Sequence, residues 1–575
     1  MNNFKETKGI TLVALIITVV ILLILAGITL NATIGENGLI SKAKDAKKET
    51  EIASIKEEIQ MDLVRKQKTE KNVTDEMVIE ILEKYGTLSE EEKLGDKILK
   101  TKENYEIKVS DVWNGTTKAN GGKEDDSEVD DPKEDKPEEP YYPGYTKVAN
   151  KPDIKVFNEK NTYYVSWDLT RNPYTIKDYT LISETEPSDW YDYTAGVNHW
   201  ANIKTTGGGN ECYWVWIPRY AYKVPTKGSV AETIEVKFLK NDTNIPIDES
   251  SITISNNLTE GSWNVHPAFT DEGNGGLGEL TGIWVAKYEA SSSIVDTIYL
   301  ENGSLKGDTE SLNGTGGGTD TSLHVRIKPN VTSWRGLSSN EVFEVCQKLT
   351  TSGNSLENTK KIDSHMMKNT EWGACAYLSS SKYGKTDGNG NRSRIYNNPY
   401  YKDFTTYATI TGLAGESPTL ITPLATSIYV YNTPKGIEAS TTGNVYGIYD
   451  MAGGAWELTA AIYREGTPDD NISRLWDSSN SKYVDKYTGT TGSQENYFGN
   501  TKYGDAIAET SKDGASVDGA WDSSISMFPN SYLTFERGGS AGLGNYAGIF
   551  AFSYADGKAN TEKSFRPVLS RNLSN

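Results

Sequence analysis

The stretch Gly443-Asn-Val-Tyr-Gly-Ile-Tyr-Asp-Met-Ala-Gly-Gly-Ala-Trp-Glu457 decides how the larger part of this chain folds. Its glycines permit turns that other residues resist, and Trp456 can fill a core. The carboxylates of Asp450 and Glu457 can accept hydrogen bonds from loop backbone or from arginines later in the chain. The residues expected to hold this fold together are Asp450, Trp456, Glu457, Arg537 and Arg566.

Short aromatic runs separated by Gly, Asn and Ser predict a mixed α+β fold with much loop. Strands are expected at Tyr163–Trp167, Tyr213–Pro218 and Gly282–Glu289. Helices are expected at Ser339–Leu349 and Asn369–Leu378.

Four segments in chain order resemble the formylglycine-generating enzyme or sulfatase-modifying-factor domain, a variant of the C-type lectin fold. They are Gly282–Glu289, Asn369–Tyr377, Gly443–Glu457, and the terminal pair Arg537–Ser540 and Ser564–Arg566. The resemblance implies a large C-type lectin-like domain over residues 205–575, preceded by a β-rich lead-in region over 146–204.

The same resemblance bears on chemistry. In the family a Gly-Asn-x-Trp-Glu stretch helps to hold calcium; here Gly454 replaces the Asn and Glu457 remains, so calcium is a candidate cofactor at Glu457. The family's oxidase activity needs a pair of reactive cysteines between its last two motifs, and none lies between Arg537 and Arg566. We therefore expect no enzyme activity and assign no catalytic residue.

The three cysteines are too few for a disulfide scaffold. Cys346 and Cys375 could pair, or both could be buried free thiols. The four histidines are scattered and indicate no metal site or nucleophile's base. The loop Asp387–Asn391 begins like a calcium loop but lacks the required Gly and Glu, and we interpret it as a turn.

In lectin-type folds the last strands and their loop form the ligand face, and here that region is rich in Tyr, Ser, Asn and Gly, as antibody loops are. The same region varies in the proteins that diversity-generating retroelements target. The candidate contact residues are Leu543, Asn545, Tyr546, Ser553, Tyr554, Asp556, Lys558 and Asn560. The alternative is a solvated loop that only closes the fold.

A second decisive stretch, Gly9–Leu30, carries no charge and as a helix reaches the roughly 30 Å of a bilayer core. Lys5 and Lys8 precede it directly, whereas a secretory signal would have a small-residue cleavage site after the apolar run. This order resembles the type IV prepilin leader. It implies a leader over residues 1–9 and a transmembrane helix over 10–32.

In that family a prepilin peptidase cuts after the Gly and methylates the new N-terminus, which places the cut between Gly9 and Ile10. Pilins usually carry Glu at the fifth mature position, where this chain has Ala14. A buried amine without a partner is costly, so the chain suits a filament tip or a membrane anchor better than a filament body. The alternative is a plain anchor that is never cut.

Residues 33–117 are expected to form a pilin-like stalk helix and a small α/β head. Apolar residues recur at helical spacing along the stalk, at Ile52, Ile55, Ile59 and Leu63. A second helix is expected to begin at Thr74 and to end at Gly86, followed by a hairpin from Lys97–Lys100 and Tyr105–Val109.

An acidic, Pro-containing linker is expected over 118–145. Lys123–Glu139 holds 3 basic and 10 acidic residues, and such a segment repels itself into an extended spacer. The net charge of −20 and the lack of a basic cluster argue against nucleic acid as a partner.

Together these features predict a single-pass membrane-anchored bacterial surface protein with an extracellular lectin-like head, an adhesin or display protein and a candidate pilus tip. Its expected partners are the membrane, prepilin peptidase, pilus or pseudopilus subunits, and an extracellular glycan or protein. Two alternatives come from other classes. One is a minor pseudopilin of a secretion, pilus or DNA-uptake machine, and the other is a formylglycine-generating-type oxidase.

Overall fold

The computed structural model describes two compact units, Met1–Lys136 and Pro137–Asn575. The residues described are 48, 52, 55, 56, 59, 63, 74–91, 93–102, 104–111, 149–224, 233–255, 261–276, 278–295, 297–301, 304–306, 314–359, 361–399, 409–418, 428–463, 469–487, 504–507, 509–511, 519–528 and 534–572. The predicted leader, cut site at Gly9 and Ile10, Ala14, membrane helix and linker over 118–145 lie outside them. No helix within these ranges is long and apolar enough to cross a membrane.

The small unit packs one helix and a three-stranded sheet onto the predicted apolar stripe. The elements are α3 (Asp75–Leu82), β1 (Gly86–Leu88), β2 (Ile98–Thr101) and β3 (Glu106–Lys108), with 3-10 turns η1 (Leu94–Asp96) and η2 (Val109–Asp111). Ile59 and Leu63 are buried in its core with Val78 and Leu99, which confirms the apolar stripe there.

The predicted second helix and hairpin of the small unit are confirmed, but a third strand was missed. The helix ends at Leu82, earlier than the predicted end at Gly86, and Gly86 instead begins β1, which pairs antiparallel with β2. A Cβ at Gly86 would lie 2.0 Å from the Lys100 carbonyl oxygen, so the close approach of the two strands requires glycine.

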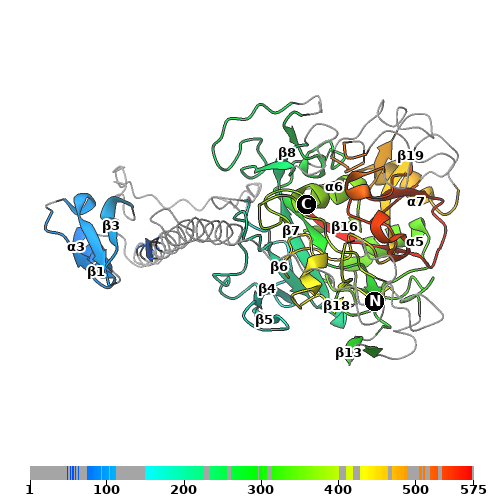
Figure 1. Cartoon of the computed structure of the whole chain (residues 1–575), viewed down its shortest axis with the longest axis horizontal. Coiled ribbons are helices and arrows are strands. Elements are labelled where there is room, and N and C mark those ends of the chain that lie inside the picture. Colours follow the sequence, from blue (N-terminus) through cyan, green and yellow to red (C-terminus); the bar gives the residue numbers. More distant parts are fainter. Residues whose placement is uncertain are drawn as a thin grey trace, which may run out of the picture. The chain divides into compact units, whose positions relative to one another are not determined.

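The large unit is mixed α+β and is built mainly from sheets (Figure 1). Its largest sheet has seven antiparallel strands in the order β16 (Ile362–Met366), β24 (Pro567–Arg571), β11 (Gly282–Ala286), β7 (Cys212–Pro218), β6 (Asn202–Thr205), β4 (Thr162–Asp168) and β5 (Thr175–Asp178). The strands predicted at 163–167 and 213–218 are confirmed as β4 and β7. The strand predicted at 282–289 ends earlier, at Ala286.

A five-stranded sheet carries the C-terminal motifs. Its strands are β20 (Asp485–Tyr487), β19 (Trp456–Tyr463), β21 (Thr534–Arg537), β22 (Phe552–Ala555) and β23 (Lys563–Phe565). The long strand β19 pairs antiparallel with β21 and parallel with both β20 and β23. One residue, Arg566, separates β23 from β24, so the chain passes there from this sheet into the seven-stranded one.

Smaller elements complete the large unit. The remaining strands are β8 (Tyr220–Lys223), β9 (Glu235–Phe238), β10 (Asn264–Val265), β12 (Ser291–Ser292), β13 (Tyr299–Glu301), β14 (Ser304–Lys306), β15 (Val325–Arg326), β17 (Leu413–Ala414) and β18 (Tyr429–Val430). The helices are α5 (Ser339–Gln347), α6 (Asn369–Ser379) and α7 (Ser473–Trp476), with α5 and α6 at the predicted places. The 3-10 turns are η3 (Gly207–Gly209), η4 (Pro267–Phe269), η5 (Lys348–Thr350), η7 (Gly436–Ala439), η8 (Ser478–Tyr483), η9 (Trp521–Ser523) and η10 (Ala541–Tyr546).

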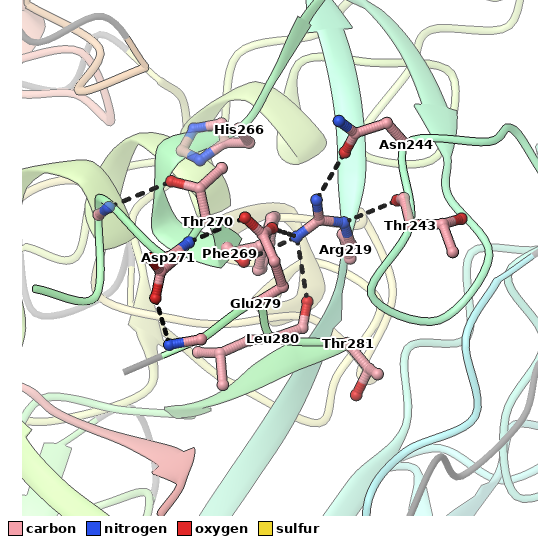
Figure 2. A network of polar contacts seen from close by, with 12 residues as sticks. Arg219, Thr243, Asn244, His266, Phe269, Thr270, Asp271, Glu279, Leu280 and Thr281 are labelled. Carbon is pink, nitrogen blue, oxygen red and sulfur yellow. Dashed lines mark hydrogen bonds and ion pairs between the residues drawn. The ribbon is translucent and has the colours of Figure 1, made fainter. Parts of the chain in front are cut away.

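A buried arginine ties together the loops that leave β7 and β9. Arg219 follows β7 directly, and its side chain is 1% exposed. Figure 2 shows its guanidinium donating to the Phe269 carbonyl at 2.7 Å and to the Asn244 side chain at 2.8 Å, with the Glu279 carboxylate at 2.5 Å. Its Nε donates to the Thr243 carbonyl at 3.0 Å. One side chain thus satisfies buried loop carbonyls that no strand pairs.

Helix α6 is docked by a buried charge network. His365 on β16 contacts the Glu371 carboxylate of α6 through Nε2 at 2.8 Å. Asp363 lies 3.6 Å from His365 Nδ1 and accepts hydrogen bonds from Lys482 at 2.8 Å and from the Tyr483 hydroxyl at 3.0 Å. Burial by itself lowers the pKa of His365, but the two carboxylates outweigh it and raise the pKa to about 9.

This network predicts that alkaline pH destabilises the large unit. A histidine whose folded pKa is raised adds stability that is complete below its unfolded pKa of about 6.5 and lost as pH rises through about 9. Between pH 7 and pH 10 the free energy of unfolding should fall by about 1 to 3 kcal/mol more in the native protein than in His365→Gln. Urea unfolding at several pH values measures this difference.

His324→Gln is the matched control, because no carboxylate of the described residues is recorded as paired with His324, and this variant should keep the native pH slope. Equal slopes for the native protein and His365→Gln would show that His365 is not held protonated in the folded state.

Candidate functional site: a buried charge cluster and the surface it supports

The C-terminal motifs meet in one buried ion pair. Arg566 donates from Nε to Glu457 Oε2 at 3.0 Å and from Nη2 to Glu457 Oε1 at 2.7 Å. It also donates to the carbonyls of Ala286 at 2.7 Å and Tyr449 at 2.9 Å. Both charged side chains are at most 1% exposed. The pair therefore joins β19 of the five-stranded sheet to β11 of the seven-stranded sheet. Of the acceptor roles that the sequence left open for Glu457, the structure shows the one toward an arginine later in the chain.

Asp450 organises the backbone around this pair. Its Oδ1 accepts hydrogen bonds from the Asn398 side chain and the Gly412 N–H, both at 2.8 Å, and its Oδ2 accepts from the Glu289 N–H at 3.2 Å. Asp450 itself has a φ of 63°, a left-handed conformation in which Asp is one of the tolerated residues. The predicted role of Asp450 as an acceptor for loop backbone is confirmed.

Sequence reasoning missed Glu289. Its Oε1 accepts a hydrogen bond from the Ala455 N–H at 3.0 Å, and the side chain is fully buried beside Asp450 and Glu457. Burial, followed by the charges of Glu457 and Asp450, raises the pKa of Glu289 well above its ordinary value. The sequence signal that could have identified Glu289 is its position shortly after the wholly apolar strand β11.

The turn before Trp456 connects the cluster to the predicted ligand face. Gly454 has a φ of 68°, and a Cβ there would lie 2.4 Å from Glu289 Oε1. Its carbonyl accepts a hydrogen bond at 3.0 Å from the Ala541 N–H, the first residue of η10. A side chain here would be strained by the left-handed backbone and would require the Glu289 carboxylate to move. The same turn holds η10 in place.

The first group of predicted contact residues lies on η10. Leu543 and Tyr546 are partly buried and pack with Met527 against Trp456 and other apolar residues. The Asn545 carbonyl accepts a hydrogen bond from Arg394 at 2.6 Å, and its side chain is partly exposed. Trp456 therefore fills a small cluster beneath this surface and not the main core.

The remaining predicted residues lie elsewhere. Ser553 on β22 is only 6% exposed and faces Met527, which removes it from the exposed set. Tyr554 is partly exposed beside Phe535 of β21. Asp556, Lys558 and Asn560 lie in the connection from β22 to β23, which hydrogen-bonds near the start of α5 through Gly557 and Asn560 carbonyls. The eight residues thus come from three consecutive segments, namely η10, β22 and the connection from β22 to β23.

Arg537 differs from the prediction. It donates to the carbonyls of Asp505 at 2.7 Å, Ala506 at 3.0 Å and Ala551 at 3.2 Å, and its guanidinium lies 5.5 Å from the Trp372 ring. Its backbone pairs with that of Glu457 where β21 runs beside β19, while these side-chain hydrogen bonds go to loop carbonyls. Its role is to hold irregular backbone beside β21.

The described side chains around Glu457 do not form a recognisable calcium site. Both oxygens of Glu457 accept hydrogen bonds from Arg566, so a calcium ion there would have to displace this ion pair. In the described ranges no group of three or more His, Cys, Asp and Glu could hold a metal. Calcium at Glu457 therefore stays a prediction.

The three cysteines, Cys212, Cys346 and Cys375, are free and buried, so the pairing alternative is wrong. Burial raises the pKa of Cys212 to about 12 and also raises the pKa values of the other two thiols.

The comparisons with known proteins do not assign the chain. A scan against protein-family models finds no match, and a search of curated proteins finds none either.

The buried cluster predicts that replacing only one partner of the ion pair strongly destabilises the large unit. Arg566→Met leaves Glu457 buried without its partner, and the free energy of unfolding should fall by about 3 to 5 kcal/mol. Urea unfolding followed by tryptophan fluorescence measures this loss. The double variant Arg566→Met with Glu457→Met should recover part of it, because no buried charge remains unpaired.

The matched control is Lys177→Met, which removes the exposed ion pair of Lys177 with Asp189 and should change the unfolding midpoint little. A double variant no more stable than Arg566→Met alone would contradict the electrostatic explanation.

Proposed function

We propose that this chain is a membrane-anchored or pilus-associated bacterial surface protein that displays a lectin-like, ligand-binding head, as an adhesin or display protein. On this proposal residues 10–32 anchor the chain in the membrane, prepilin peptidase processes it at Gly9 and Ile10, and the large unit binds a glycan or protein outside the cell. No catalytic step is part of the proposal.

The observation that carries the proposal is the surface of η10. Leu543, Tyr546 and Met527 are partly exposed around Trp456, and aromatic residues and Met are enriched at binding interfaces. The turn that presents them is held by hydrogen bonds from Arg394 and from the Asn397 side chain to carbonyls of Asn545 and Gly544. Apolar side chains on a rigid backbone bind with little loss of conformational entropy.

The state of the cysteines supports a binding protein over the oxidase alternative. Thiol chemistry needs an accessible thiol with a lowered pKa, whereas these thiols are buried and have raised pKa values.

One observation supports the pseudopilin alternative. In the small unit a helical stripe with Ile59 and Leu63 packs against a short helix and a three-stranded sheet, an arrangement that suits a pilin-like subunit. Under that alternative the chain is an assembly part of a secretion or pilus machine. Co-purification with pilus or pseudopilus subunits, lost on deletion of the prepilin peptidase gene, would favour it.

The adhesin proposal predicts that the η10 surface is needed for binding. The full-length chain should bind at least one member of an array of glycans and extracellular-matrix proteins, and Leu543→Ala with Tyr546→Ala should weaken that binding by about 2 kcal/mol or more. Biolayer interferometry with the full-length chain measures the affinity.

Tyr163→Ala provides the matched control, because Tyr163 is a partly exposed tyrosine on β4 and should leave binding unchanged. Binding that survives the double variant, with a native unfolding curve, would move the ligand face away from η10. Absence of binding to any array member would favour the assembly-subunit alternative.

A further inference from the structure

A polar groove opens on the large unit where three turns meet. It is formed by residues 196–199, by residues 384–387 with Ser393, and by Glu438 with residues 442–444, and its volume is about 490 Å³. That volume lies within the roughly 300 to 1,000 Å³ of small-molecule sites. None of the predicted contact residues lines it, so it is independent of the η10 surface. Its lining includes Asn198, His199, Lys385, Asp387, Thr442 and Asn444.

The walls of the groove are fixed to one another. The Asn198 side chain donates to the Gly384 carbonyl at 2.8 Å, and the Asn444 side chain donates to the carbonyls of Val197 and Asn198 at 3.1 Å. Lys385 is buried and pairs with Glu438 at 2.7 Å. These contacts join all three turns, so the groove exists before a ligand arrives.

Several polar groups in the groove remain available. The structure records no hydrogen bond within the described residues for the ring nitrogens of His199 or for the hydroxyls of Thr386 and Ser393. His199 stacks on Tyr446, with ring centroids 4.2 Å apart and an interplanar angle of 13°. Burial lowers the pKa of His199, with Asp192 and Asp189 opposing, so the ring is neutral at pH 7 and offers one donor and one acceptor.

The charge of the groove restricts the ligand class. Lys385 is already neutralised by Glu438, and Asp387 adds a negative charge, in a chain of net charge −20. An anionic ligand would therefore be repelled. An apolar ligand would cover the Thr386 and Ser393 hydroxyls and the His199 imidazole without offering them partners, which is costly.

We propose that this groove binds an uncharged polyhydroxylated ligand, of which a neutral oligosaccharide is the representative. Such a ligand offers hydroxyls that both donate and accept, and the free groups of the groove, His199, Thr386 and Ser393, do the same. The groove and the η10 surface are then two separate binding sites of the large unit.

The test uses the full-length chain in a zwitterionic detergent, because detergents with sugar headgroups would compete. A glycan array with neutral, sialylated and sulfated oligosaccharides serves as the probe. Neutral oligosaccharides should bind. His199→Phe keeps the ring that stacks on Tyr446 but removes both ring nitrogens, and should weaken binding about tenfold or more.

A second groove variant and a control variant complete the test. Thr386→Val with Ser393→Ala removes the two free hydroxyls and should weaken binding similarly, which covers the case in which His199→Phe does not fold. His324→Phe makes the same exchange away from the groove and should bind as the native chain does.

Three results would overturn the proposal. The first is that no neutral oligosaccharide binds. The second is that only sialylated or sulfated glycans bind. The third is that oligosaccharide binding survives the groove variants but is lost in Tyr546→Ala, which would assign the glycan to the η10 surface.

Discussion

The buried pair of Arg566 and Glu457 is the constraint on which the large unit depends. The chain leaves one sheet and enters the other at a single residue, and that residue is Arg566. A residue at such a crossing has no strand partner on either side, so its surroundings contain unpaired carbonyls. Arg566 satisfies two of them and neutralises Glu457 with its remaining donors. An ion pair so deeply buried is stable only because nearly every donor is used.

The same solution recurs through the fold. Arg219 donates to loop carbonyls of Thr243 and Phe269, and Arg537 donates to those of Asp505, Ala506 and Ala551. The physical reason is the amount of irregular backbone that the chain buries. A loop inside a protein must pair its carbonyls as a strand does, and one guanidinium offers five donors in a rigid plane. Buried arginines therefore replace regular sheet hydrogen bonds where the chain is mostly turns.

Sequence reasoning located what has a local signal. The aromatic strands β4 and β7 were predicted, because strand composition can be recognised one segment at a time. Glu457 and Arg566 were predicted as residues that hold the fold together, but which arginine pairs with Glu457 was left open. Helix α6 was also predicted, although it is buried on every face and has no apolar stripe. Glu289 and the groove could not be predicted, because their partners lie far along the chain. The groove in particular is made by three turns that only the folded topology brings together.

One segment, residues 385–394, supports both surface sites. Arg394 donates from its side chain to the carbonyls of Asn545 and Ala547 beside η10, and its own carbonyl accepts from Lys385 in the groove at 2.9 Å. Coupling between two sites requires an element with two alternative arrangements that both ligands bias. Here the segment is held at both ends by buried hydrogen bonds, together with the Arg392 to Asp522 pair at 2.7 Å. Such a segment fixes the two surfaces relative to each other without transmitting a change, so a ligand in the groove should leave the affinity of the η10 surface unaltered.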